Sequence, residues 1–399
     1  MPSTAPGPWR RLARPLPSLL AVASAVVLTG SASPRPAATG VSRTYYVAAD
    51  EVDWDYAPAD SDLTMGQPLP KAVFAVTNAP PVVARVMRKA IYREYTDSTF
   101  TRLKPRPAKW QHLGILGPVL RGAVGDTIVV VFRNDTHFPV TMHPHGVFYT
   151  KANEGSMTND GTGPADKGDD GVPPGGTYRY VWPIPERAGP GPNDPSSVIW
   201  VYHSHADEVR DPYSGLIGPI IVTRRGMARP DGSPRDVDRE FVTMFASFDE
   251  NTTHFVHENL QRYTGDTATV VAAGPRHFHE TQYHTINGLM FGNIPLASLT
   301  MHVGERVRWY VFTSSGFDDF HTPHWHGNTL LVHGHREDVL DMGGPLLMRE
   351  ADMVPDNPGI WMDHCHNLNH ARDGMVFHLA YAGIETPFSS GGPSANRPE

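Results

Sequence analysis

One sequence pattern occurs twice along the chain, and few folds are compatible with it. Each copy has a β-rich stretch, a loop with the motif His-x-His-Gly, and a second β-rich stretch that ends in His-x-His. The copies begin at Val124 and Val303, and their motifs are His143–Gly146, His203–His205, His324–Gly327 and His364–His366. Trp200 and Trp361 each stand three residues before the closing triplet. This duplication predicts two copies of one β-sandwich unit.

Turn-forming residues indicate an all-β chain. The 399 residues include 37 glycines and 38 prolines, which is typical of many turns between short strands. No long amphipathic helix is expected, and Ala84–Arg93 is predicted to form one or two helical turns. The Gly-, Pro- and Arg-rich stretch Arg224–Pro234 predicts the boundary between the units, which gives domains at 44–225 and 226–388.

The N-terminus has the pattern of an export signal. Arg10, Arg11 and Arg14 precede an apolar run that ends near residue 28, and small residues follow at 31–33. The run is too short to span a membrane, so secretion is expected. The paired arginines are compatible with twin-arginine export. We therefore assign 1–33 to a signal peptide, 34–43 to a flexible leader and 389–399 to a disordered tail.

Cys365 is the only cysteine, and it lies between two histidines in Asp363-His364-Cys365-His366. Along a strand, His364 and His366 point to one side and Cys365 to the other. One metal bound to the thiolate, with a metal cluster behind it, suits this arrangement. A thiolate, two imidazoles and a distant methionine form a blue-copper electron-transfer site. Cys365, His370 and Met375 supply three of these ligands, and a histidine from elsewhere must supply the fourth.

The paired histidines indicate a second metal site. A lone His-x-His pair on a strand is more often structural than metal-binding. Four pairs in two matched repeats suit a cluster of several copper ions, because neutral imidazole binds copper well. Paired carboxylates are missing among them, which argues against di-iron, and zinc would leave the thiolate without a role.

Together these motifs resemble the multicopper oxidase family over nearly all of residues 44–388. The first half, with Ile115–Arg121 and His143–Gly155, resembles the ceruloplasmin branch, and the two-domain architecture resembles the small laccases. The resemblance implies two cupredoxin-like Greek-key β-sandwich domains. It also implies four coppers per functional site: one type 1, one type 2 and two type 3.

The resemblance also implies a role for each ligand. His321, Cys365 and His370 would bind the type 1 copper with Met375 as the axial ligand, and His143 and His324 would bind the type 2 copper. The type 3 pair would be bound by His145, His203, His205, His326, His364 and His366. Structural or supporting roles are expected for His277, His279, His284, His333 and His335.

Two positions depart from the repeat or the family pattern. Ser204 stands where the second half has Cys365, so domain 1 is expected to lack type 1 copper. Asp363 stands where an apolar residue is usual in the family. Three readings of Asp363 remain open: it tunes the copper potential, relays protons or faces solvent.

The implied activity is a laccase-like oxidation of phenols or aromatic amines coupled to reduction of O2 to water. A ferroxidase of the ceruloplasmin kind is the alternative, because acidic residues lie near His321; these are Asp318, Asp319, Glu337, Asp338 and Asp341. A solvated acidic edge is the simpler interpretation of them. A copper nitrite reductase and a non-catalytic copper-binding protein are weaker alternatives, because all the cluster histidines are present and the thiolate is in the second half.

The sequence also leads to expectations about binding partners, assembly and proton supply. The net charge of −8 argues against nucleic acid. Two-domain relatives join domain 1 of one chain to domain 2 of the next, so a homotrimer with interfacial clusters is expected. Glu154 is expected to relay protons, and Tyr149 either donates an electron or is a core aromatic.

Overall fold

The computed structural model describes residues 40–74, 84–265, 282–314 and 319–383. The predicted signal peptide, most of the leader and the tail lie outside these residues, as do His277, His279 and Asp318. Strand β1 begins at Ser42, so the last two residues of the predicted leader belong to this strand. Among the described residues, no helix is long and apolar enough to cross a membrane.

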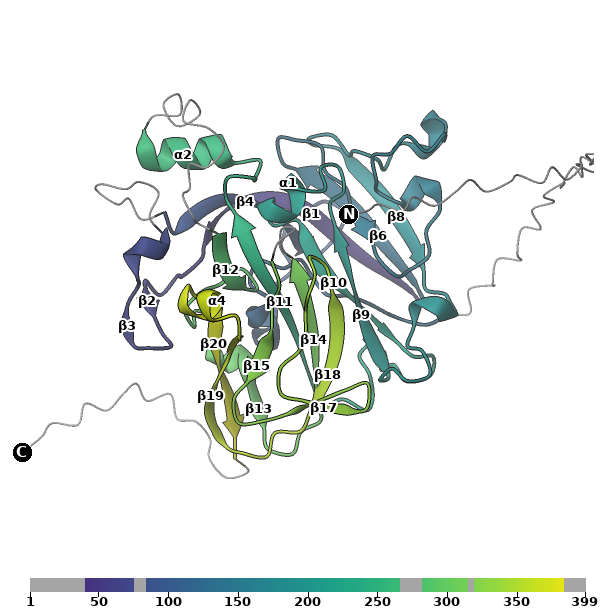
Figure 1. The fold of residues 1–399 in the computed structure, drawn as a ribbon. Helices are drawn as coiled ribbons and strands as arrows, with labels where there is room; N and C mark the ends of the chain where they lie inside the picture. Colours follow the sequence, from purple (N-terminus) through teal and green to yellow (C-terminus); the bar gives the residue numbers. More distant parts are fainter. Residues whose placement is uncertain (1–39, 75–83, 266–281, 315–318, 384–399) are drawn as a thin grey trace, which may run out of the picture. The chain divides into compact units, whose positions relative to one another are not determined.

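The first half contains two four-stranded sheets (Figure 1). In spatial order, the first sheet is β4 (Val86–Tyr95), β1 (Ser42–Asp55), β6 (Thr127–Asp135) and β8 (Thr177–Pro183). The second is β5 (Leu120–Ala123), β10 (Ile217–Thr223), β9 (Ser197–His203) and β7 (His143–Pro144). Strand β1 runs parallel to β6 and β5 parallel to β10, whereas the other neighbours are antiparallel.

The second half repeats this arrangement. Its first sheet is β12 (Gln282–Ile286), β11 (Arg239–Asp249), β14 (Val307–Ser314), β18 (Met348–Met353), β16 (Leu330–Val332) and β17 (His335–Glu337). Its second is β13 (Thr300–His302), β20 (Val376–Ala382), β19 (Gly359–Cys365) and β15 (Pro323–Trp325). β11 is parallel to β14 and β13 to β20, as in the first half. The predicted pair of β-sandwiches is confirmed.

Short segments complete the chain. Strands β2 (Ser61–Asp62) and β3 (Gln67–Pro68) form a small ribbon. The α-helices are α1 (Arg210–Ser214), α2 (Val256–Thr264) and α4 (Leu368–Arg372). The 3-10 helices are Lys71–Phe74, Ala108–Leu113, Lys151–Asn153, Pro164–Asp166, Glu186–Ala188 and Leu296–Leu299. Helix α2, nine residues long, has no counterpart among the sequence predictions.

The predicted helical turns at Ala84–Arg93 are wrong, because this segment forms strand β4. Its basic residues have cross-strand or buried partners. Arg88 pairs with Glu51 of β1, and Lys89 is fully buried against Glu250. Pairing with β1 along the whole strand therefore overrides local propensity.

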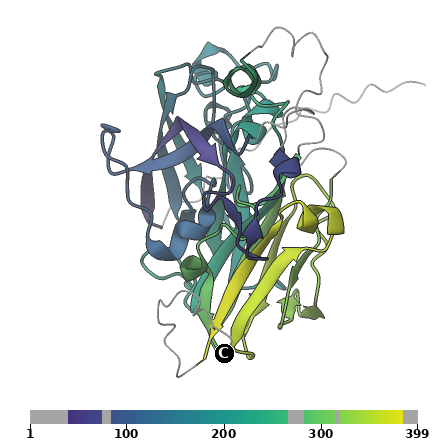
Figure 2. The same cartoon turned by 90° about the vertical axis from the view of Figure 1, so that its left-hand side faces the viewer.

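Three apolar cores organise the described residues. One lies within the first sandwich and another within the second. The third contains residues of both halves, including Met87, Ile221 and Phe312. The two sandwiches are therefore joined by a shared core. Strands β19 and β20, the yellow strands that lie side by side in Figure 2, are antiparallel neighbours, and the C-terminal ligand motif lies at the end of β19 and in the segment that joins it to β20.

Candidate metal centre

Cys365 ends β19 and meets two histidines from neighbouring segments. His321 lies just before β15 and His370 lies in α4. The Cys365 Sγ is 3.9 Å from His321 Nδ1 and 3.6 Å from His370 Nδ1, and the two nitrogens are 3.2 Å apart. All three side chains are buried. Three donor atoms therefore converge on one point, and their chemistry fits the His, His and Cys set of a blue-copper site.

Main-chain hydrogen bonds hold Met375 beside this group. Met375 N donates to His370 O at 2.9 Å, and Cys365 N donates to Met375 O at 3.2 Å. The Met375 side chain is fully buried. Thr322 N donates to Cys365 Sγ at 3.3 Å, which fixes the sulfur from the opposite strand. The predicted axial ligand is thus in the same buried pocket as the thiol.

A carboxylate lies on the other side of the His370 ring. His370 Nε2 is 3.1 Å from Asp319 Oδ1, and Asp319 is only 11% exposed. Burial raises the pKa of Asp319, but the hydrogen bond from His370 and the charge of His321 bring it down to about 2. The solvated-edge interpretation is therefore wrong for Asp319. Glu337 is partly exposed, while Asp338 and Asp341 are exposed.

His284, for which a structural or supporting role is expected, completes this outer group. Its ring stacks on His370 with centroids 4.2 Å apart and planes 16° apart. Its Nδ1 lies 2.7 Å from Ser247 Oγ. Ligand atoms of His284, Asp319 and His370 lie close enough together to hold a metal ion. The sequence offered no signal for this contact, because β12 is remote from α4 along the chain. His333 and His335 are exposed.

Four histidines of the first sandwich form a second group. His143 and His203 are directly opposite one another on β7 and β9. His145 Nε2 is 3.1 Å from His203 Nε2, and the His205 ring lies 5.0 Å from that of His143. His143 Nδ1 donates to Glu154 O at 2.6 Å, which leaves Nε2 available. Burial lowers the pKa of His203 to about 3 and that of His145 to about 4, so both are in the neutral form that binds copper.

The second sandwich holds a matching group. His324 and His364 are directly opposite on β15 and β19, and the His366 ring lies 5.5 Å from both. His326 Nε2 is 3.1 Å from His364 Nε2. Because a metal–imidazole bond is about 2.0 Å long, two nitrogens at this separation reach one ion. The same spacing recurs between His145 and His203, so the donors of both groups fit a metal.

The two groups of four remain apart within one chain. No hydrogen bond or ring contact links the first four histidines to the second four in the described ranges. One chain therefore presents two half-sets of imidazoles.

Tyr149 and Glu154 both lie near the first half-set. The Tyr149 ring is 5.7 Å from that of His143 in an edge-on arrangement. Burial raises the pKa of Tyr149. Glu154 meets His143 through its main-chain carbonyl, whereas its carboxylate contacts Lys151 Nζ at 2.6 Å.

Asp363 is fully buried, so the reading in which it faces solvent is wrong. Neither carboxylate oxygen has a hydrogen-bond partner among the described residues. Burial and the neighbouring Cys365 raise its pKa well above the usual range. Asp363 lies opposite Trp325 in the second core.

Known proteins resemble the chain in both sequence and fold. Two family models described as multicopper oxidase match residues 95–226 and 265–382. Human ferroxidase HEPHL1 is 39% identical over 340 residues and human ceruloplasmin is 38% identical over 340 residues. Each match covers 84% of this chain, which spans only 29% and 30% of those proteins. A solved multicopper oxidase has a TM-score of 0.54 at 17% identity, covers 86% of this chain and 89% of its own, and supports the fold alone.

Proposed function

Because the chain belongs to the multicopper oxidase family, we propose that it couples one-electron oxidation of a small substrate to four-electron reduction of O2 to water. The observation that carries this proposal is the convergence of Cys365 Sγ with the Nδ1 atoms of His321 and His370. Copper bound at the thiolate site and at the paired histidines would supply the electron storage and the oxygen chemistry. The ligand roles are those predicted from the motifs.

The chain itself connects the two kinds of site. Cys365 lies between His364 and His366, so one strand end holds the thiolate and two imidazoles in a continuous covalent path. The His364 Nδ1 also donates to the Cys365 carbonyl at 2.8 Å. This geometry fixes the ring of His364 against the main chain next to the sulfur.

Ferrous iron, or another small reduced metal cation, is the substrate class that we favour. Asp319 places a buried carboxylate against the outer nitrogen of His370, and His284 stacks on the same ring. A carboxylate and an imidazole at this point suit a cation whose electron would pass through His370 to copper held at the Cys365 site. The matched relative named a ferroxidase supports the same choice.

Phenols are the second candidate, because two apolar side chains flank the same entry point. Phe320, beside His321, is 52% exposed, and Leu368, two residues before His370, is 71% exposed. A flat aromatic substrate would bury part of this surface. Initial rates of O2 uptake with ferrous iron and with dimethoxyphenol, on copper-loaded protein, discriminate between the two substrates.

The two half-sets of histidines within one chain support a proposal about assembly. A complete cluster forms when the histidines of domain 1 (44–225) meet those of domain 2 (226–388) in a neighbouring chain, which gives a cyclic homotrimer. Light scattering on copper-loaded protein is expected to give the mass of three chains. A fully active monomer would contradict this assembly. Residues 1–33 would direct export before assembly.

Proton and electron supply at the first half-set falls to Glu154 and Tyr149. Glu154→Ala is expected to change the pH profile of turnover, because it removes the carboxylate beside the His143 loop. Unaltered turnover at every pH would rule out the relay. Tyr149→Phe tests electron donation, since it removes the hydroxyl and keeps the ring contact with His143.

Cys365→Ser tests the central claim. The variant is expected to lose the intense blue absorption of the copper-loaded protein and its O2 consumption together, because the hydroxyl is a poor substitute for the thiolate. Retention of O2 consumption without the sulfur would refute the proposed function.

A further inference from the structure

The main chain around Ser204 in the first sandwich is hydrogen-bonded in the same way as the main chain around Cys365. We call this shared main-chain arrangement the frame. Three hydrogen bonds of that frame have counterparts at matching positions. Ser204 N donates to Leu216 O (3.1 Å), as Cys365 N does to Met375 O (3.2 Å). Leu216 N donates to Asp211 O (3.1 Å), as Met375 N does to His370 O (2.9 Å). Thr141 N donates to Ser204 Oγ (3.0 Å), as Thr322 N does to Cys365 Sγ (3.3 Å). Gly215 and Gly374, with φ of 113° and 118°, make the same turn before the following strand.

The side chains in this frame are different. The positions of His321, Cys365, His370 and Met375 are taken by Val140, Ser204, Asp211 and Leu216, all fully buried. Valine and leucine offer no ligand atoms. Because serine also replaces cysteine, the frame does not offer a second thiolate site, although its main-chain hydrogen bonds match those of the Cys365 site.

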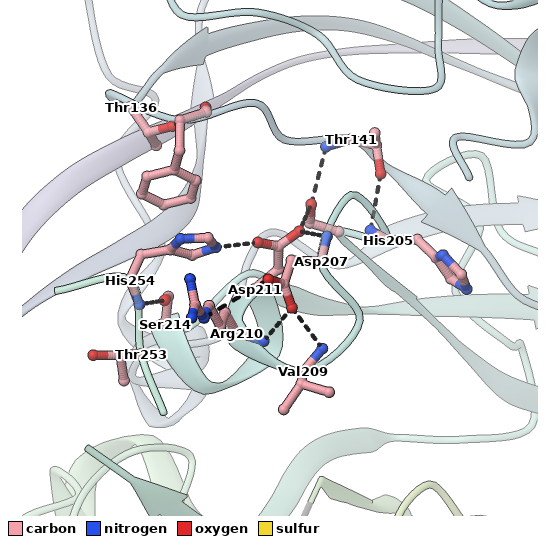
Figure 3. A network of polar contacts seen from close by, with 12 residues as sticks. Thr136, Thr141, His205, Asp207, Val209, Arg210, Asp211, Ser214, Thr253 and His254 are labelled. Carbon is pink, nitrogen blue, oxygen red and sulfur yellow. Dashed lines mark hydrogen bonds and ion pairs between the residues drawn. The ribbon is translucent and has the colours of Figure 1, made fainter. Parts of the chain in front are cut away.

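A hydrogen-bond network fills the centre of the frame (Figure 3). Ser204 Oγ donates to Asp211 Oδ2 at 2.5 Å, and Asp207 N donates to the same oxygen at 2.9 Å. His254 Nε2 donates to Asp211 Oδ1 at 2.7 Å. A carboxylate accepts hydrogen bonds only, so three donors satisfy Asp211, two from the loop between β9 and α1 and one from His254 after β11. Bonds of this kind to a charged acceptor are stronger than neutral ones.

His254 ties the network to the second half of the chain. It follows β11, and its ring stacks on Phe138 of the first half with centroids 3.8 Å and planes 15° apart. The main-chain N–H of His254 donates to Ser214 Oγ, next to Gly215, at 3.1 Å. The His254 ring is therefore held on its face and at its nitrogen, and it cannot swing away from Asp211 without breaking both contacts.

The network leads directly to two predicted copper ligands. Ser204 lies between His203 and His205 in the chain. Thr141, which donates its main-chain N–H to Ser204 Oγ, accepts the main-chain N–H of His205 on its own Oγ1 at 2.9 Å. Figure 3 shows these contacts running from His254 through Asp211 to Thr141 and His205.

We propose that Asp211 and His254 are positioning residues for His203 and His205, and that the network they form has replaced a copper ion in domain 1. This inference rests on the proposed function, because it assumes that the two histidines bind copper. Partners that orient metal ligands typically change metal affinity about 10- to 100-fold when they are lost.

The test uses Asp211→Asn and His254→Leu in the full-length protein. Each is expected to weaken copper binding at the histidine cluster about 10- to 100-fold, measured by copper titration and by the near-ultraviolet band of the coupled type 3 pair. The blue absorption of the Cys365 site is expected to stay unchanged. His254→Gln keeps an N–H donor at the position of Nε2, and it is expected to restore the type 3 band.

Glu250→Gln is the matched control, since it changes another fully buried acid of the same segment with no bond to the network. Type 3 binding at the wild-type level in both Asp211→Asn and His254→Leu would overturn the inference. So would a loss in His254→Gln or Glu250→Gln equal to that in His254→Leu, because general destabilisation would then explain it. Wild-type protein that shows no blue absorption would instead refute the proposed function.

Discussion

Asp319 Oδ1 lies 3.1 Å from His370 Nε2, on the opposite side of the ring from the nitrogen that faces Cys365 Sγ at 3.6 Å. The imidazole thus separates a buried acid from the thiol. The Nε2–H of His370 donates a hydrogen bond to the Asp319 carboxylate. This bond fixes the tautomer in which Nδ1 faces the sulfur of Cys365. This one ring therefore contacts both the carboxylate of Asp319 and the thiol of Cys365.

Asp319→Asn is therefore expected to lower kcat/KM for ferrous iron about 10- to 100-fold, the equivalent of about 1.5–3 kcal/mol for a hydrogen bond to a charged group. The rate with dimethoxyphenol should fall much less, because a neutral substrate gains little from the negative charge. Initial rates of O2 uptake with both substrates measure this. Asp341→Asn, at an exposed acid of the same region, is the control, and an equal loss in that variant would remove the specific role of Asp319.

Glu350 gives a pH dependence of stability with a definite sign. It is buried beside Ile199, whose N–H it accepts at 2.7 Å, and burial raises its pKa to about 7. The folded state then holds a proton that the unfolded state has lost, so stability falls as pH rises from about 4.5 through about 7, by about 3 kcal/mol in all. Glu350→Gln should be more stable than wild type at about pH 8 and similar to it at about pH 5.

Urea unfolding of both proteins at the two pH values measures the difference, since the contributions of other groups cancel. Asp341→Asn, which changes an exposed acid, should leave the slope as it is in wild type. Parallel curves for wild type and Glu350→Gln would contradict the assignment.

The Lys89–Glu250 ion pair should be a strong link between the halves. Both side chains are fully buried, Lys89 Nζ also donates to Tyr213 O at 2.7 Å, and Tyr56 donates to Glu250 Oε1 at 2.5 Å. Lys89→Met leaves a buried carboxylate without its cation and should cost about 3–5 kcal/mol of unfolding free energy. Replacing both residues, as in Lys89→Met with Glu250→Leu, should cost less than the two single changes added together. A purely additive double-mutant cycle in urea would disprove the coupling.

The features that could be predicted from the sequence are those that depend on short-range spacing and on the internal repeat. The alternation of side chains along a strand was enough to place His364 and His366 on one side of Cys365, and the repeat correctly predicted two similar sandwiches. The convergence of His321 with Cys365 and His370 came from the family motifs. These features follow from spacing within a motif, which sequence preserves.

The features that sequence did not predict all depend on contacts between distant segments. Strand β4 lies where helical turns were predicted, and its pairing with β1 determines its structure. Asp319 and Asp363 were both candidates for a solvated surface, but Asp319 packs against His370 of α4 and Asp363 is fully buried in β19. The stacking of His284 on His370 and the bond from His254 to Asp211 join residues whose separation along the chain carries no signal.

The glycine that ends each of the two His-x-His-Gly motifs offers the last test, because both glycines pack on the tryptophans noted in the repeat. Gly146 and Gly327 have φ of 75° and 72°. A Cβ on Gly146 would lie 2.2 Å from the Trp200 ring, and one on Gly327 would lie 2.8 Å from the Trp361 ring. Trp200 Nε1 donates to Ala188 O at 2.8 Å and Trp361 Nε1 to Asn357 O at 2.9 Å, so neither ring is free to retreat.

Gly334 separates the two causes of strain. Its φ is 83°, and a Cβ there would meet nothing within 4 Å. Gly334→Ala should therefore cost about 1–2 kcal/mol from the backbone alone. Gly146→Ala and Gly327→Ala should cost about 1–3 kcal/mol more, because the ring or the histidine loop must move. They should also reduce copper at the type 3 pair, since His145 and His326 immediately precede these glycines. Equal costs in all three variants, measured by urea unfolding and copper analysis, would show that the tryptophan contacts do not set the position of the histidines.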